Sequence, residues 1–279
     1  MSKIRQLAPL LFLLVSACVP KAFLLEQPKL VSVYFERKIE KLEKAKSPDL
    51  DSQRLLMRTK VEYGFGIIME QASRLIDEDY KQAMAKYEQA NKIFSEARDS
   101  GILIISKRYP SFNNWLNKEA SIDFNADDMN DIYWLAASIG GCISSSRGNP
   151  FELINLPNVG RLLRKGIDIN PGWENGSLYS AMISFTTTRS DLNEVMLRDS
   201  VDYYFEKDVL YSGGKEAGPY LPYDESLHKP FQERKNFVDK LNYVINMENK
   251  PNNEFELTNL LAKSRAKWLL ARTVEYFLE

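Results

Sequence analysis

The side chain best suited to acid–base chemistry in this sequence is His228, the only histidine in the chain. A Ser–His–Asp or Cys–His device would have to use it, because such devices rely on an imidazole to carry the proton. The surrounding segment, Leu227-His228-Lys229-Pro230, contains no nucleophile motif. We therefore interpret His228 as an exposed loop residue and predict that the protein is not an enzyme.

Three acidic or amide residues copy the first ligand spacings of a calcium-binding EF-hand loop: Asp123, Asn125 and Asp127. The loop also needs a glycine at its sixth position and a bidentate glutamate at its twelfth. Asp128 and Trp134 stand at these two positions. We predict no calcium site and interpret the segment as a helix start, with Asn125 as its N-cap.

The run Gly213-Gly214-Lys215 resembles part of a phosphate-binding loop. Such a loop requires an earlier glycine where Val209 stands and a Ser or Thr directly after the lysine. Both are missing, so we interpret the glycines as a helix C-cap. The sequence predicts neither a metal nor a cofactor.

Cys18 is the strongest candidate for covalent chemistry. Lys3 and Arg5 precede an apolar run, residues 7–15, that is too short to cross a bilayer, which needs about 20 apolar residues. The run ends in Val15-Ser16-Ala17-Cys18, which resembles the lipobox of bacterial lipoproteins. We predict a signal peptide over 1–17, lipid attachment at Cys18 and a tether over 18–29. The alternative is a cysteine that merely ends a signal cut elsewhere.

With Cys18 acylated, Cys142 is the only remaining thiol, so packing alone must stabilise the fold. The chain is long enough for one extended domain or two ordinary ones. Its 37 Lys and Arg balance 38 Asp and Glu, and the basic residues are scattered among acidic ones. Nucleic acid is therefore not an expected partner.

Apolar residues recur at helical spacing through the rest of the chain, which predicts an all-α domain over 30–279. A first helix over 30–42 should stop before Ser47-Pro48-Asp49. A second should run from Asp51 or Ser52 to Ile76, with Gly64 and Gly66 where a neighbouring backbone could come close. A third should follow the acidic residues 77–79, which suit a helix N-terminus.

Three stretches show the spacing of small and large residues that is typical of TPR repeats: Ala83, Tyr87 and Ala90; Val159, Leu163 and Gly166 before Asn170-Pro171; and Phe237, Leu241 and Val244 before Pro251. Because each helix pair needs neighbours to cover its apolar face, we predict TPR-like helical hairpins in a solenoid-like domain. An irregular helical bundle is the alternative.

Several separated stretches are similar to one family in a consistent order. Segment 131–140 reads DIYWLAASIG, followed by a serine-rich turn at 143–146, and further matches lie at 153–157, 168–176, 212–220 and 261–270. The chain resembles the TatT family, the T component associated with tripartite ATP-independent periplasmic (TRAP) transporters. It departs from the family pattern at Ile139, where an aromatic residue is usual, and at Ser264, where Gln or Arg is usual.

The resemblance implies a periplasmic lipoprotein with TPR-like hairpins and a cleft or pore through the helical body. It also implies a substrate-binding protein of the transporter as partner, and a homo-oligomer, a trimer by family resemblance. An outer-membrane location is favoured over the inner membrane, because Val19 stands where some inner-membrane lipoproteins carry Asp. A general envelope scaffold without a transporter is the alternative function.

For a ligand- or partner-binding surface we single out Tyr133 and Trp134, with Tyr63 as a third candidate. Aromatic side chains offer apolar area with a polar tip. Tyr133 and Trp134 are consecutive and point roughly 100° apart on a helix, so both cannot face the same core and one is expected at a cleft. The alternative is that both are packed between hairpins.

Replacing Cys18 by Ser should release the protein from the membrane while leaving its helical part folded, because two or more acyl chains supply the attachment. Membrane fractionation with an acyl label measures this. A Cys18→Ser variant that stays membrane-bound at high salt without the label would show that the anchor is wrongly assigned.

Overall fold

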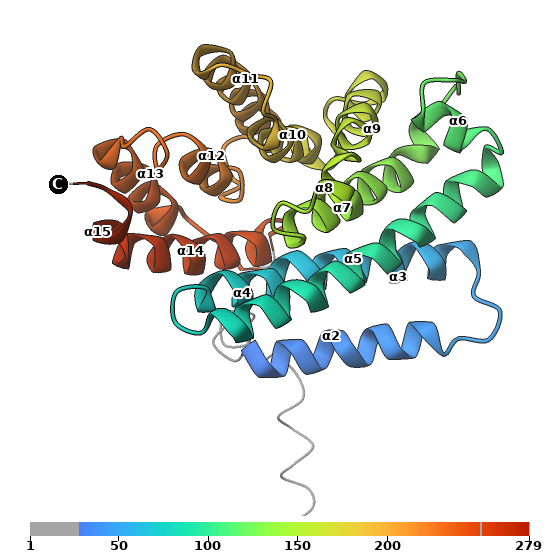
Figure 1. Ribbon diagram of the computed structural model, residues 1–279, viewed down its shortest axis with the longest axis horizontal. Coiled ribbons are helices and arrows are strands. Elements are labelled where there is room, and N and C mark those ends of the chain that lie inside the picture. The colour runs from blue at the N-terminus through green and yellow to red at the C-terminus, as the bar shows by residue number, and fades with distance from the viewer. Residues whose placement is uncertain (1–27, 252, 279) are drawn as a thin grey trace, which may run out of the picture.

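The computed structural model describes residues 28–251 and 253–278, and all regular structure in these residues is helical (Figure 1). The predicted signal peptide, Cys18 and the tether up to residue 27 lie outside the described residues. The all-α prediction is confirmed. Successive helices pair along the chain, as expected for helical hairpins.

The N-terminal part consists of three long helical segments, residues 28–43, 50–75 and 80–108, and the second begins at Leu50, one residue before the predicted Asp51. Asp49 and Asp79 are N-caps, and their carboxylates accept hydrogen bonds from the backbone N–H groups of Ser52 and Gln82. The predicted second helix continues through a π-helical turn without a break. The elements are α2 (Pro28–Glu43), α3 (Leu50–Tyr63), the π-helix η1 (Gly64–Met69), α4 (Glu70–Leu75) and α5 (Tyr80–Arg108).

The central part is built around α7, which follows a short 3₁₀ turn. The predicted N-cap at Asn125 is confirmed: its side chain accepts from the N–H of Asp127, and Asp128 in turn accepts from the N–H of Asn125, forming a capping box. The elements are α6 (Phe112–Leu116), η2 (Ala126–Asp128), α7 (Met129–Ser145), α8 (Pro150–Leu153) and α9 (Leu156–Ile169).

The remaining helices complete the fold. Gly213 is the C-cap of α11 with φ 61°, which confirms the predicted role of the glycine pair. In Figure 1, α10 and α11 lie above α7, while the last four helices form a group at the C-terminal side. The elements are η3 (Trp173–Gly176), α10 (Ser177–Thr188), α11 (Glu194–Ser212), α12 (Tyr220–Ser226), α13 (Arg234–Asn246), α14 (Glu256–Ala271) and α15 (Thr273–Tyr276).

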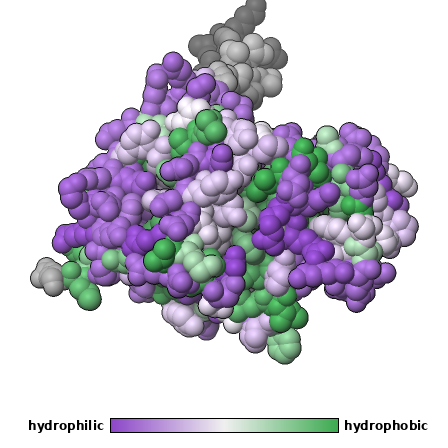
Figure 2. All heavy atoms as spheres, turned by 90° about the horizontal axis from the view of Figure 1, so that it is seen from above, coloured by the Kyte–Doolittle hydropathy of each residue, from purple (hydrophilic) through white to green (hydrophobic). Residues whose placement is uncertain are grey.

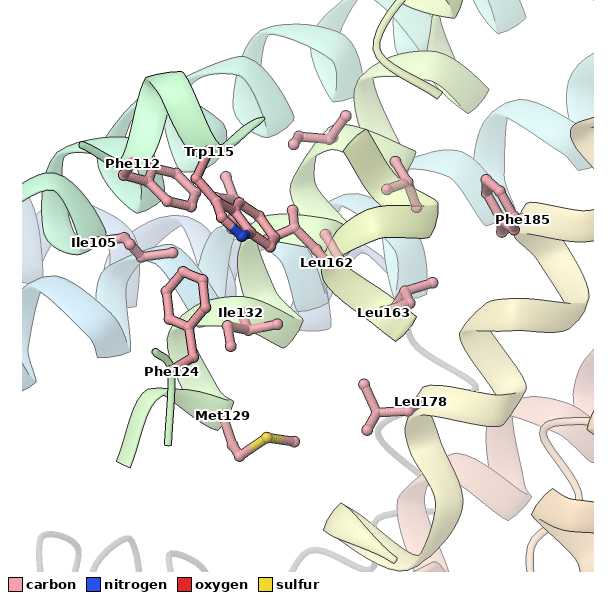
Figure 3. Close-up of a cluster of buried hydrophobic side chains, with 14 of the residues drawn as sticks. Ile105, Phe112, Trp115, Phe124, Met129, Ile132, Leu162, Leu163, Leu178 and Phe185 are labelled. Carbon is pink, nitrogen blue, oxygen red and sulfur yellow. The ribbon is translucent and has the colours of Figure 1, made fainter. Parts of the chain in front are cut away.

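Three main hydrophobic clusters hold these parts together. The first joins α7, α9 and α10 and is closed by the rings of Phe112, Trp115 and Phe124 (Figure 3). The second joins α3, η1, α5 and α7 around Phe94. The third lies within the C-terminal group, around Phe237 and Leu241 of α13. Because α7 contributes to both the first and the second cluster, it connects the N-terminal hairpins to the rest.

The residues that carry the TPR-like spacing all belong to these buried faces. Ala83, Tyr87 and Ala90 are buried on α5; the corresponding residues of α9 and α13 are Val159, Leu163, Gly166, Phe237, Leu241 and Val244. Small residues at these positions let neighbouring helices approach closely.

Phe94 of α5 is fully buried and occupies a slot between two glycines on different helices. A Cβ atom at Gly64 would lie 2.5 Å from the Phe94 ring, and one at Gly141 would lie 2.3 Å from it. The sequence correctly marked Gly64 as a point of close approach, but what approaches is an aromatic ring rather than a backbone. Both glycines are needed because no side chain fits beside the ring.

The prediction that His228 is an exposed loop residue is wrong. His228 lies in a turn, but its side chain is buried, with 7% of the residue's surface exposed. Its Nδ1 pairs with the buried carboxyl of Asp224, and its ring packs edge-on against Tyr223. Burial raises the pKa of Asp224 to about 6, while the contact with His228 opposes that rise. Since Asp224 is itself fully buried, the pair fastens the turn after α12.

Neighbouring glycines on α7 provide a matched test of this packing. Gly141→Ala should destabilise the protein by about 1–3 kcal/mol, because Phe94 is enclosed and cannot withdraw from the new methyl group. Gly140→Ala, one residue away, meets nothing within 4 Å and should stabilise it by about 0.4–1 kcal/mol. Denaturant unfolding of both variants measures the two effects. Equal effects of both variants would contradict this account of Phe94.

Candidate functional site

A cavity of about 840 Å³ lies between the N-terminal hairpin, the central helices and α14. Its walls are largely apolar. From above, the mostly hydrophilic surface of the protein is interrupted by apolar patches (Figure 2). The lining residues are Leu30, Val31, Tyr34 and Phe35 of α2; Val61, Glu62, Phe65, Gly66 and Ile67 of α3 and η1; Tyr133, Trp134, Ala136, Ala137, Gly140, Ile143 and Ser144 of α7; Leu156, Val159 and Leu163 of α9; Ser180, Ala181, Ser184, Phe185 and Thr188 of α10; and Leu257, Thr258 and Leu261 of α14.

The cavity exists because two helices that would otherwise meet present small side chains there. On α7 these are Ala136, Ala137, Gly140 and Ser144, and on α10 they are Ser180, Ala181 and Ser184. A Cβ atom built at Gly140 meets nothing within 4 Å. The same helix therefore packs tightly at Gly141 and leaves open space at Gly140.

Tyr133 and Trp134 both line this cavity. Their rings meet edge to face at 5.0 Å, with an interplanar angle of 84°. Tyr133 packs against the first cluster and also touches Trp173, at 4.8 Å, whereas Trp134 packs against the second. The two rings thus face different cores, as their angular separation predicted, and meet at the wall between them.

Trp134 also borders a second, smaller hollow of about 170 Å³ on α3 and α7. There the guanidinium of Arg58 lies over the Trp134 ring, 5.2 Å from its centroid. Arg54 closes this side with a bidentate bond to the buried carboxylate of Asp131, at 2.8 and 2.6 Å. Trp134 therefore separates a charged hollow from the apolar cavity.

Tyr63 lies elsewhere. It is 2% exposed, stacks on Phe35 at 5.3 Å and donates its hydroxyl to Glu36 at 2.8 Å. Burial, followed by the Glu36 carboxylate, raises the pKa of Tyr63 to about 12. Tyr63 fastens α2 to α3 behind the cavity wall and is not a lining residue.

The two positions where the chain departs from the family pattern also lie away from the cavity wall. Ile139 is buried in the first cluster, and the hydroxyl of Ser264 accepts from Arg74 at 3.1 Å. Sequence reasoning missed the walls supplied by α2 and α14. Their apolar residues carried no motif, and only the folded chain brings them together.

α14 reaches the cavity because polar contacts hold it against α4. Arg265 donates to the hydroxyl of Ser73 at 3.0 Å and pairs with Glu70 at 3.4 Å. Arg272 pairs with Asp77 at 3.2 Å. This seam is charged, unlike the apolar contacts within the C-terminal group.

Among the lining residues the only charged one is Glu62. Its carboxylate pairs with Arg58 at 2.7 Å, so it presents no uncompensated charge. The described residues contain no group of His, Cys, Asp and Glu that could hold a metal ion. The lining is therefore apolar, and its one charged side chain is paired.

Two buried acidic side chains, Asp208 and Glu216, lie near the part of the cavity wall that contains Ser180 and Tyr133. Asp208 of α11 is fully buried, and neither of its carboxyl oxygens has a hydrogen-bond partner among the described residues. Burial, followed by the charge of Glu216, raises the pKa of Asp208 to about 8, while the nearby Ser180 amide lowers it by less. Burial also raises the pKa of Glu216 to about 7. Burial, then Glu216, Glu174 and Asp208, raises the pKa of Tyr133 far above its usual value, which places these acids near the cavity.

Comparison with known proteins decides the family. The model of a family described as the TRAP transporter T-component matches residues 38–277. The chain belongs to this family. Members of this family are accessory components of transporters, and the family is not an enzyme family. Membership implies association with other transporter components.

A related chain is an uncharacterized protein of Treponema pallidum (strain Nichols), 20% identical over 236 residues, which cover 80% of this chain and 71% of the relative. Family membership indicates a membrane-associated protein of the periplasm. Within the described residues, every helix is too short or too polar to cross a membrane.

Proposed function

We propose that this T-component docks the soluble substrate-binding protein of a TRAP transporter and holds a small apolar ligand in the cavity between α7 and α10. The observation that carries the ligand-binding part is the apolar cavity itself. Its volume of about 840 Å³ falls within the roughly 300–1,000 Å³ that small-molecule sites occupy. The docking part rests on family membership.

The cavity wall supports a ligand of low polarity. Burying apolar surface contributes about 25 cal/mol per Å², and aromatic rings supply large areas at small entropic cost. Tyr133 and Trp134 provide such rings on α7, and Phe65 of η1 adds another to the lining. The single charged group is already neutralised by Arg58.

The location forms part of the same proposal. Lipid attached to Cys18 tethers the helical domain to the periplasmic side of a membrane, the outer membrane in preference to the inner one. Assembly as a homo-oligomer, a trimer in the family pattern, belongs to the proposal as well. A general envelope scaffold remains the competing function, and binding of the transporter subunit separates the two.

Filling the cavity should abolish ligand binding without unfolding the protein. Gly140→Leu projects a side chain into open space, so we expect at least a tenfold weaker affinity, about 1.4 kcal/mol, for the neutral dye N-phenyl-1-naphthylamine, with a melting temperature that is not lowered. Dye fluorescence titration measures it. Gln89→Leu, at an exposed position of α5, is the control and should bind like the wild type. Undiminished dye binding by Gly140→Leu would place the ligand outside this cavity.

The transporter assignment predicts a direct complex. The protein should bind the substrate-binding subunit of a TRAP system encoded beside its gene, with Kd on the order of micromolar, as for transient complexes. Because the net charge is −1, moderate salt should weaken binding only partly. Isothermal titration calorimetry, with an unrelated periplasmic binding protein as control, tests this. Lack of association at every salt concentration would favour the envelope scaffold.

A further inference from the structure

We propose that the ligand of the cavity is an uncharged amphiphile, with an apolar chain and hydroxyl or ester oxygens along one side, and that the cavity discriminates against carboxylate anions. This inference rests on the proposed ligand-holding function and names the chemical class of that ligand. It depends on a row of hydroxyl groups on α10 and on the charges around it.

The hydroxyl row consists of Ser180, Ser184 and Thr188, which are spaced four residues apart and all line the cavity. Residues at this spacing share one face of a helix, about 6 Å apart along its axis. Ser144 adds a fourth hydroxyl from α7. The cavity therefore has one polar stripe in an otherwise apolar lining.

Three of these hydroxyls have free hydrogen-bonding capacity. Within the described residues, the hydroxyls of Ser180, Ser184 and Ser144 form no hydrogen bond, whereas that of Thr188 donates to the carbonyl of Ser184 at 2.8 Å.

Serines elsewhere on α7 behave differently: Ser138, Ser145 and Ser146 all donate to carbonyls of their own helix, at 2.8, 2.6 and 2.7 Å. Ser144 sits between them and does not, because its side chain lines the cavity. The hydroxyls at the cavity are thus available to a ligand that brings its own donors or acceptors.

The rest of the lining fits an apolar chain. Phe65 and Ile67 of η1 and Leu261 of α14 line it, together with apolar residues of α2 and α9. Gly66 leaves room between η1 and α14, where a Cβ atom would lie 4.0 Å from Leu261. A molecule with one polar edge and one apolar edge satisfies both kinds of wall, whereas a pure hydrocarbon would leave the hydroxyl row without ligand partners.

The lining offers an anionic head group no cationic partner. Among the described residues that line the cavity there is no Lys or Arg, and Arg58 beside it is already bound to Glu62. Outside the lining, the guanidinium groups of Arg164 and Arg189 lie over the ring of Phe185, 5.7 and 6.0 Å from its centroid, and Arg189 is paired with Asp191.

The carboxyl groups of Asp208 and Glu216 lie near Ser180 and Tyr133, and burial raises their pKa values to about 8 and about 7, so Glu216 carries more negative charge than Asp208 near neutral pH. An ionised carboxylate placed at the row would lose its hydration without gaining a cation from the lining, and it would lie near the ionised fraction of Glu216.

Competition between two ligands with the same chain tests the inference. Full-length protein carrying Cys18→Ser, handled without detergent, is loaded with N-phenyl-1-naphthylamine and titrated at pH 7.4 with 1-decanoylglycerol or decanoate. We expect 1-decanoylglycerol to displace the dye at about tenfold lower concentration than decanoate. Equal competition by both ligands would overturn the inference.

Variants of the hydroxyl row separate recognition from general packing. Ser180→Ala/Ser184→Ala should weaken 1-decanoylglycerol about tenfold, the effect of losing two ordinary hydrogen bonds, and leave dye affinity within twofold. Alanine favours helix, so folding is retained. Thr187→Ala, outside the lining of the same helix, is the matched control. Equal losses for dye and 1-decanoylglycerol would overturn the role of the row.

Glu216→Gln tests the electrostatic part, because removing this charge should improve decanoate binding severalfold and leave 1-decanoylglycerol unchanged. An unaltered preference would contradict the role of the acids. If the dye itself does not bind the wild type, the ligand-holding function fails and the inference with it. If the dye binds and only the discrimination is missing, the inference alone fails.

Discussion

The fold depends on how closely other helices and side chains can approach the two sides of α7. On one side Gly141 admits the ring of Phe94, which couples α7 to the N-terminal hairpins. On the other side Gly140 and its small neighbours stop short of α10 and leave the cavity open. Tight packing and open space alternate along one helix because glycine and alanine residues occupy both faces.

An open apolar cavity costs stability, since its walls forgo the contacts that a filled core would make. The protein offsets this with three separate clusters and with Tyr133 and Trp134, which pack against different clusters and still expose ring surface to the cavity. The C-terminal group adds its wall through α14, held in place by Arg265 and Arg272. The cavity is thus bounded by parts that are each held by contacts outside it.

Local signals predicted the helices well, because caps act within a few residues. Asp49, Asp79, Asn125 and Gly213 each end or begin a helix where their side chains or backbone freedom require it. The partner of His228, Asp224, is only four residues away in the sequence, but the burial of both side chains depends on tertiary packing that local signals do not show.

The site was harder to predict than the helices. Tyr133 and Trp134 were found as aromatic residues on an otherwise small-residue helix, and both line the cavity. Tyr63 looked similar but faces α2, because the side of α3 on which it lies packs against that helix. The walls from Leu30 and Leu261 come from opposite ends of the chain, and only tertiary packing places them on one cavity.

The burial of Asp208 couples folding to proton uptake. An exposed aspartate loses its proton near pH 4, whereas Asp208 keeps its proton to about pH 8, so the folded chain binds one more proton between these values. Stability must therefore fall as the pH rises through this window, since the unfolded chain can release the proton and the folded chain cannot do so without burying a charge. Asp208 lies on α11, which pairs with the α10 that carries the hydroxyl row, so acidification within this window stabilises the fold that holds the row.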